Sequence, residues 1–355
     1  MNRSLACRAW NVPHGILCGV MLALLGCVPA IAPGHAEPKN IYARQFEEYW
    51  YKFDRLYPYF DYKHVDWQAV YAHYRPLAYK ATNERQLVTL LATMGATLKD
   101  VHVWLRSPAG KYVNTYNPAR AADPNWRAAI LGKKYVTDLE YFGGADWGFG
   151  HVHGFGYIFI DDWNKRALSL QDFDAVLSQF PSNTGLILDV RMNGGGDEAL
   201  AYKVAGYFAS RPHLSEYYRY RNGPLPSDLG HAVPRYLEPS LGAHYTGPVM
   251  LLIGPDSFSS TENFIAAMQT LPQVTTVGAT TGGASGCPRT FSLGKGWHYS
   301  VPICYDMTAR GRVIEWNGIK PEVTVATTPA DFKHGDDPVL DRAVMLLRAK
   351  LKAAK

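Results

Sequence analysis

The sequence GLILDVRMNGGG, at residues 185–196, joins an apolar run to a glycine-rich turn. Residues 185–190 are almost continuously apolar, which is typical of a strand covered on both faces. Three glycines after such a strand let the backbone come close to a ligand and direct its amides at an anion. The turn lacks the ending of a phosphate-binding P-loop and the glycine spacing of a dinucleotide-binding turn. It therefore predicts either an oxyanion-binding loop or a simple tight turn.

Strands and helices alternate on both sides of this stretch, which predicts a layered α/β core. Short apolar runs bounded by turn residues indicate strands, and apolar residues at spacings of three and four indicate helices. The expected strands are residues 155–160, 185–190, 249–253, 274–278 and 323–325, and the expected helices are residues 170–180, 198–208 and 261–271.

The N-terminal half has a different pattern. Residues 41–96 carry many aromatic side chains at helical spacing, and these stripes indicate a packed core rather than a cofactor site. Residues 107–150 are rich in Pro, Asn, Gly and Ala and have weak periodicity. We therefore expect a small helical domain over residues 37–106, connecting loops with short strands over residues 107–150, and the α/β core over residues 151–355.

The composition is that of an ordinary globular protein. Of 355 residues, 47% are hydrophobic and 19% are charged. This balance allows a substantial core and excludes a disordered chain, a collagen-like repeat and a coiled coil. The net charge of +5 is not concentrated in any run of Lys or Arg, so we expect no nucleic-acid partner.

Residues 1–36 have the features of a signal peptide. Arg3 and Arg8 precede an apolar stretch at residues 16–28, which is shorter than the roughly 20 residues that span a bilayer. Small residues before Glu37 suggest a cleavage site there. Alternatively, the sequence LLGC ending at Cys27 resembles a lipobox, which would make Cys27 the lipidated first residue. Either way we expect an exported protein, periplasmic or extracellular, whose only membrane contact would be a lipid anchor at Cys27.

Cysteine usage agrees with export. Three of the five cysteines lie in residues 1–36, and Cys287 and Cys304 remain. These two flank residues 289–301, which resemble a hairpin, and opposed positions on a hairpin bring sulfurs within bonding reach. We therefore predict a disulfide between them, with two buried free thiols as the alternative.

A cluster of hydroxyl groups marks one end of a predicted strand. The sequence LLIGPDSFSSTE, at residues 251–262, passes from a strand through a turn into a helix. A serine at such a helix start meets free backbone amides and the helix dipole, which favour developing negative charge. The same residues also form a capping-box pattern, Ser259-x-x-Glu262, so a purely structural role is an alternative.

Other polar residues are less specific by themselves. His102, in LKDVHV at residues 98–103, lies at the start of a short predicted strand, where a histidine is often structural. His151 and His153 have a spacing that two metal ligands can have, but no third ligand follows in a recognisable pattern. Glu315, in VIEWNGIKPE at residues 313–322, could orient an imidazole or simply face solvent.

Taken in order, five segments resemble the peptidase family S41, the group of tail-specific, C-terminal processing and tricorn-core serine peptidases. The similarity runs from about residue 46 to residue 347. The segments are Asp100-x-His102, Asp189-x-Arg191-x-Asn193-x-Gly195-Gly196, Ser257-x-Ser259-x-x-Glu262, Val277-Gly278-x-x-Thr281-x-Gly283 and Gly318-Ile319-x-Pro321-Glu322.

The resemblance implies a fold and a nucleophile. The fold is a ClpP/crotonase-like layered α/β core preceded by the helical domain. Ser259 is the implied nucleophile, with Ser257 and Ser260 as fallbacks. The implied oxyanion hole consists of backbone amides of Gly194 or Gly195 and of Ser260.

The resemblance also implies the base. One branch of the family activates its serine with a lysine, but that position holds Ala284 here. The chain fits the other branch, which makes His102 the base and Glu315 its orienting group. Some such enzymes place a relay serine before the histidine; here Val101 stands there, so contact between Glu315 and His102 would be direct or through water. Residues 107–150 are too short for the PDZ module that many relatives carry.

These observations predict a secreted serine endopeptidase that acts on peptide or protein substrates without a metal ion or cofactor. One alternative is a non-catalytic ligand- or peptide-binding protein on the same scaffold. Another is a metal-dependent hydrolase that uses His151 and His153. The sequence does not determine the oligomeric state.

Overall fold

The apolar run of the opening stretch forms β6 (Leu186–Asp189), the middle strand of a seven-stranded sheet. The computed structural model describes residues 40–117, 125–242 and 244–353. Five strands of the sheet are parallel and two at one edge are antiparallel. In spatial order they are β14 (Val323–Thr324), β10 (Val274–Gly278), β9 (Val249–Ile253), β6, β5 (Phe155–Ile160), β4 (Trp147–Val152) and β3 (Thr137–Phe142).

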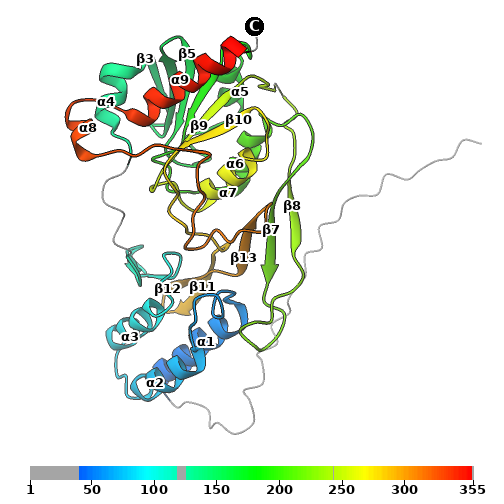
Figure 1. The fold of residues 1–355 in the computed structure, drawn as a ribbon. Helices are drawn as coiled ribbons and strands as arrows, with labels where there is room; N and C mark the ends of the chain where they lie inside the picture. Colours follow the sequence, from blue (N-terminus) through cyan, green and yellow to red (C-terminus); the bar gives the residue numbers. More distant parts are fainter. Residues whose placement is uncertain (1–39, 118–124, 243, 354–355) are drawn as a thin grey trace, which may run out of the picture. The chain divides into compact units, whose positions relative to one another are not determined.

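Helices cover both faces of this sheet (Figure 1). Alternate residues of β6 point to opposite faces, so Leu186 and Leu188 join one apolar cluster and Ile187 joins another. The first cluster is completed by α5 (Leu170–Leu177), α6 (Glu198–Gly206) and α7 (Ser260–Met268), and the second by α9 (Pro338–Ala353) and η1 (Leu131–Tyr135). The shorter helices are α4 (Ala128–Ile130) and α8 (Pro329–Lys333).

The sheet begins earlier than residue 151, where the sequence places the start of the core. Strands β3 and β4 lie within the segment expected to hold only loops and short strands. Gly148 and Gly150 explain why the sequence pattern of β4 is weak. A Cβ atom on Gly148 would lie 2.3 Å from Glu140 O, and one on Gly150 would lie 2.6 Å from Thr137 O. Glycine is needed for this close pairing, and it removes the apolar side chains that would have marked a strand.

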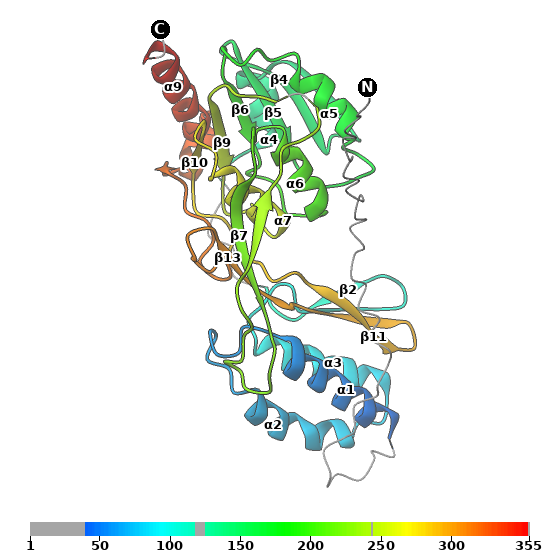
Figure 2. The same ribbon diagram turned by 90° about the vertical axis from the view of Figure 1, so that its right-hand side faces the viewer.

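The N-terminal helices pack on a second, four-stranded sheet (Figure 2). Asn40, Asp66 and Asn83 cap the three helices with their side chains. The aromatic stripes face inward, and their cluster also includes Leu293, Tyr299 and Val301 from much later in the chain. The helices are α1 (Ile41–Leu56), α2 (Trp67–Tyr79) and α3 (Glu84–Ala96); the strands, in spatial order, are β11 (Arg289–Gly294), β12 (Trp297–Val301), β1 (Trp104–Arg106) and β2 (Tyr112–Asn114).

The predicted α/β class with an N-terminal helical region is therefore confirmed.

A third, antiparallel sheet follows the order β13 (Cys304–Thr308), β7 (His213–Tyr220) and β8 (Val233–Leu237). Within the described residues, no helix is both long and apolar enough to span a bilayer. The predicted signal peptide, including Cys27, lies outside the described residues.

Cys287 and Cys304 form a disulfide, as predicted from their positions around the β11–β12 hairpin. Their Cα atoms are 5.5 Å apart and their sequence separation is 17 residues. The bond closes the hairpin at its base, beside Gly286 and close to Ser285.

Loss of this disulfide should destabilise the folded protein. Replacing both Cys287 and Cys304 with serine should lower the free energy of unfolding by about 3 kcal/mol, the chain-entropy value for a closed loop of roughly 15 residues. Denaturant titration of the two proteins measures the difference. A reductant should lower the stability of the parent protein and leave the variant unchanged; equal stability of the two proteins would contradict this prediction.

Candidate active site

Ser259 occupies a strained turn between β9 and α7. Its backbone angles are φ 55° and ψ −127°, a positive φ that non-glycine residues rarely adopt. A serine held in a sharp turn from strand to helix presents its hydroxyl away from the backbone at the helix start. The Ser259 amide donates to Ala284 O at 3.1 Å and to Glu262 Oε2 at 3.3 Å, so the turn is fixed from two sides.

Glu262 ties this turn to the segment after β10. Its buried carboxylate accepts hydrogen bonds from Gly283 N at 2.9 Å, Ala284 N at 2.8 Å and the Thr281 hydroxyl. Burial raises the pKa of Glu262 to about 7, although these donors favour the ionised form. The capping box expected at Ser259 is present, and the Ser259 hydroxyl has a further neighbour in the imidazole of His102.

His102 lies in the turn between α3 and β1 rather than in the strand itself. Its Nε2 atom is 3.0 Å from Ser259 Oγ, and its Nδ1 atom is 3.1 Å from Ser285 O. A backbone carbonyl can only accept a hydrogen bond, so Nδ1 must carry the proton of the neutral ring. Nε2 then has a free lone pair directed at the Ser259 hydroxyl, which is the tautomer that a general base requires.

The surroundings of His102 keep its ring neutral. Burial lowers the pKa of the imidazole below its usual 6.5, and the Lys63 ammonium lowers it further. The Asp100 carboxylate and the hydrogen bond to Ser285 oppose this shift without cancelling it. At neutral pH the ring is therefore able to accept a proton.

Glu315 makes no hydrogen bond to this imidazole among the described residues, so of the two expected contacts, direct or through water, the direct one is absent. Among the described residues its carboxylate binds Lys63 Nζ at 2.6 Å and the Ser285 amide at 3.0 Å. Its connection to the ring of His102 passes through Ser285, whose carbonyl is the partner of Nδ1. Burial and the nearby Asp100 charge raise the pKa of Glu315 to about 8, against the lowering effect of Lys63.

Two backbone amides are candidate donors for an oxyanion site. The amides of Gly194 and Ser260 have no hydrogen-bond acceptor among the described residues, and Ser260 is the first residue of α7. Gly195, the alternative donor, is already engaged, because its amide donates to Asn193 Oδ1 at 2.9 Å. Its role is steric: a Cβ atom there would lie 2.8 Å from Ser259 Cβ, so only glycine allows this approach.

The fallback serines have structural partners. Ser257 is fully buried and donates its hydroxyl to Val190 O at 2.8 Å, while Ser260 donates its hydroxyl to Gly196 O at 2.8 Å. Neither hydroxyl faces an imidazole in these contacts. Of the three serines, Ser259 is the one whose hydroxyl meets a potential base.

A small pocket opens beside Ser259. It is lined by Glu198, Asn263, Gly286 and Pro288 together with the serines of the turn. The candidate metal pair is elsewhere: His151 Nδ1 lies 3.9 Å from Asp138 Oδ2, and the described part of the chain has no group of three or more potential metal ligands.

Sequence reasoning missed Lys63 and Ser285. Lys63 has no recognisable motif around it and lies 252 residues from Glu315. Ser285 acts through its backbone, which no residue pattern identifies. The one available signal was the buried Asp100 near the histidine, since a carboxylate buried in the fold needs a partner.

Comparisons with known proteins agree with this geometry. Residues 154–325 match the description Peptidase family S41, and residues 38–96 match the Tricorn protease C1 domain. The crystal structure of a protein described as a peptidase, from Parabacteroides merdae, superposes with a TM-score of 0.76 at 30% identity, covering 87% of this chain and 97% of the other. The photosystem II D1 C-terminal processing protease, 15% identical with a TM-score of 0.53 over 85% of this chain and 97% of that one, shares the fold.

Curated relatives are much longer than the matched region. The tricorn protease of Thermoplasma volcanium is 29% identical over 204 residues, which are 56% of this chain and 18% of that protein. The chain therefore spans less than a fifth of this relative. Both matched family regions leave out His102, so the position of this residue is known from the structure alone.

Proposed function

Because the chain belongs to peptidase family S41 and is thereby a serine peptidase, we propose that it hydrolyses peptide bonds through an acyl-enzyme, with Ser259 as nucleophile and His102 as general base. The observation that carries this proposal is the 3.0 Å separation of His102 Nε2 and Ser259 Oγ. A serine hydroxyl is a weak nucleophile at neutral pH and needs a base within about 2.6–3.2 Å.

In the first step, Ser259 Oγ attacks the carbonyl carbon of the scissile peptide while His102 Nε2 takes the hydroxyl proton. The resulting imidazolium keeps its Nδ1 proton, which stays hydrogen-bonded to Ser285 O. The tetrahedral oxyanion accepts hydrogen bonds from the amides of Gly194 and Ser260, which have no other acceptor among the described residues. Such donors typically contribute about 2.7–4 kcal/mol each to transition-state stabilisation.

The second half of the reaction uses the same groups. His102 returns its proton to the leaving amine, the C–N bond breaks, and the acyl group stays on Ser259. Water then loses a proton to His102 and attacks the ester, and the protonated ring restores the Ser259 hydroxyl as the acid product leaves. The pocket beside Ser259 gives room for a substrate side chain, and we propose peptides or proteins as substrates.

Covalent labelling tests the proposal directly. A fluorophosphonate probe should react once per chain, and fragmentation of the labelled peptide by mass spectrometry should place the adduct on Ser259. Prior unfolding of the protein should prevent labelling. Absence of an adduct on the folded protein would favour a non-catalytic binding protein. An adduct on Ser257 or Ser260 would show that this serine, and not Ser259, is the nucleophile.

The pH dependence follows from the lowered pKa of His102. A general base works only when deprotonated, so kcat/KM should rise as the pH increases through the pKa of the free enzyme. Since that pKa lies below 6.5, the midpoint of the rise should lie below pH 6.5 and a plateau should follow. Initial rates from pH 4.5 to 8.5 measure the profile; a midpoint above pH 7, or no rise at all, would contradict a histidine base in this setting.

We also propose that the protein works outside the cytoplasm, after removal of residues 1–36 or after lipidation at Cys27. The support is the pattern of charge and apolar residues at the N-terminus, together with the disulfide between Cys287 and Cys304. Intact-mass measurement of protein expressed in a Gram-negative host decides between the forms. Chains beginning at Glu37 indicate cleavage, a lipid adduct on Cys27 indicates an anchor, and retention of residues 1–36 would contradict export.

A further inference from the structure

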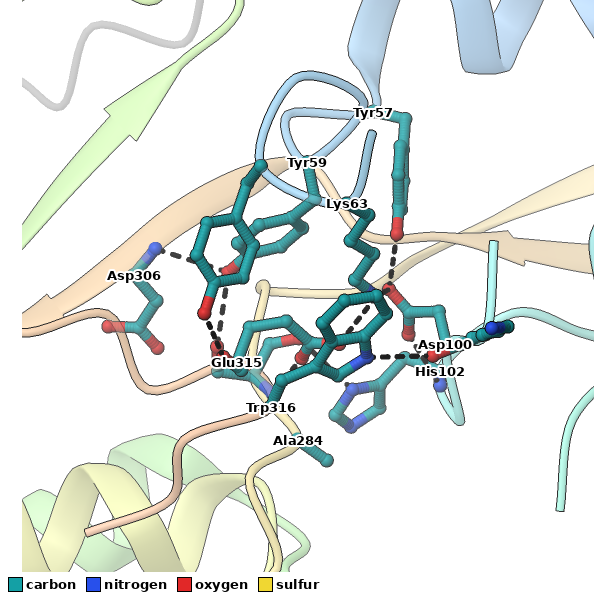
Figure 3. Close-up of polar contacts among 12 residues, drawn as sticks. Tyr57, Tyr59, Lys63, Asp100, His102, Ala284, Asp306, Glu315 and Trp316 are labelled. Carbon is teal, nitrogen blue, oxygen red and sulfur yellow. Dashed lines mark hydrogen bonds and ion pairs between the residues drawn. The ribbon is translucent and has the colours of Figure 1, made fainter. Parts of the chain in front are cut away.

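Lys63 is a buried ammonium group without any role in the reaction described so far. It lies in the turn between α1 and α2, its side chain is 0% exposed, and its Nζ atom is 3.0 Å from Asp100 Oδ2 and 2.6 Å from Glu315 Oε1 (Figure 3). A charge in such a place must be paired to be tolerated. Three aromatic rings surround it, with centroids 5.0–5.7 Å from Nζ: Tyr57, Tyr59 and Trp316.

Each carboxylate that binds Lys63 uses its second oxygen on a backbone amide next to the imidazole. Asp100 Oδ1 accepts from the amide of His102 at 2.9 Å. Glu315 Oε2 accepts from the amide of Ser285 at 3.0 Å, and Ser285 O is the partner of His102 Nδ1. Two chains of contacts therefore run from one ammonium group to the two sides of one histidine.

We propose that Lys63 is a positioning residue for the base, which holds Asp100 and Glu315 at the separation that places the His102 backbone and the Ser285 carbonyl around the ring. The proposal rests on the proposed role of His102 in peptide hydrolysis. Lys63 itself does not touch Ser259 in the described contacts. Besides its charge, which helps to keep the ring of His102 neutral, Lys63 acts on the reaction through the orientation and tautomer of the imidazole.

Removal of the ammonium group would leave two buried carboxylates facing each other. Like charges in a buried site repel, so one carboxylate would take up a proton or move away. The Asp100 carboxylate would keep its hydrogen bond from the Tyr57 hydroxyl, at 2.8 Å. Among the described residues, the Glu315 carboxylate would keep only its hydrogen bond from the Ser285 amide. The Ser285 carbonyl would then lose its fixed position against His102 Nδ1, and with it the preference for the reactive tautomer.

Kinetics of Lys63→Met test the inference. Methionine has a similar length and no charge. We expect kcat to fall about 10²-fold, as for a misplacement of a catalytic group by roughly 1 Å, with KM nearly unchanged because substrate does not contact residue 63. Lys99→Met is the matched control, since Lys99 is an exposed lysine beside Asp100, and it should keep the parent kcat. A loss confined to KM, or none in Lys63→Met, would overturn the proposal.

A second readout does not depend on activity. With ¹⁵N-labelled histidine, the parent protein should show His102 as one tautomer, with the proton on Nδ1, and Lys63→Met should show averaged ring shifts for the same residue. Identical ring shifts in both proteins would overturn the proposal. If the parent protein hydrolyses no peptide, the proposed function fails, and this comparison still decides the role of Lys63.

Loss of a buried ion pair can prevent folding, so a second variant is needed. Lys63→Met combined with Glu315→Gln removes the cation together with one carboxylate charge and keeps an acceptor for the Ser285 amide. We expect this protein to fold, as judged by its circular dichroism, and to show the same loss of kcat and the same averaged His102 shifts. If the folded double variant has the kcat and the His102 ring shifts of the parent protein, the proposal is overturned.

Discussion

Ser259→Ala is expected to abolish peptide hydrolysis, lowering kcat by roughly 10⁵–10⁶-fold, the order seen when a serine nucleophile is removed. The fold should persist, because the hydroxyl removed faces His102 at 3.0 Å and its second role, as the capping-box acceptor at the start of α7, contributes only about 0.5–2 kcal/mol. Alanine can occupy the same strained turn, since the backbone amide of residue 259 keeps its hydrogen bonds to Ala284 and Glu262.

Turnover of a peptide substrate and denaturant titration together check this expectation. Ser257→Ala is the matched control: it removes a hydroxyl two residues away, which donates to a buried carbonyl, and covalent labelling of Ser259 should survive. Undiminished turnover in Ser259→Ala would refute the assignment of the nucleophile.

His102→Ala is expected to cause a loss of similar size, because the serine is unreactive without a base. The double variant Ser259→Ala, His102→Ala should be no slower than either single variant, since residues that act as one catalytic unit have non-additive effects. Measured kcat values for the three proteins test both statements. Additive losses, or a His102→Ala enzyme with more than a few per cent of parent activity, would contradict the proposed dyad.

His73→Ala is the control for loss of a histidine. His73 lies on the exposed side of α2, beside Tyr74 and away from every contact described for the site. Its kcat and KM should equal those of the parent. The stability of both histidine variants should be measured as well, so that unfolding is not mistaken for loss of the base.

The sequence predicted the parts of the fold whose signal is local. Continuous apolar runs marked β5, β6 and β9, and the change from strand to hydroxyl-rich turn marked the start of α7. Short strands were expected within residues 107–150, but the place of β3 and β4 in the main sheet could not be predicted, because Gly148 and Gly150, which the close pairing requires, interrupt the hydrophobic pattern of β4.

The candidate site divides in the same way. Ser259 and His102 could be named because each stands in a short motif, and the structure brings their side chains together. The position of Glu315 could not be derived, because its partners are an ammonium group from a distant turn and a backbone amide. The sequence could not exclude the Gly195 amide as an oxyanion donor, because its hydrogen bond to the Asn193 side chain depends on the conformation of the turn.

The aromatic cluster contains late residues such as Leu293 and Tyr299 as well as the first helices. Strand β1, which follows His102 closely, pairs with β12 of the hairpin, so the segment that bears the imidazole is held in place by a much later part of the chain. Assembly of the proposed Ser259–His102 pair is therefore expected to require the docked hairpin as well as the main sheet.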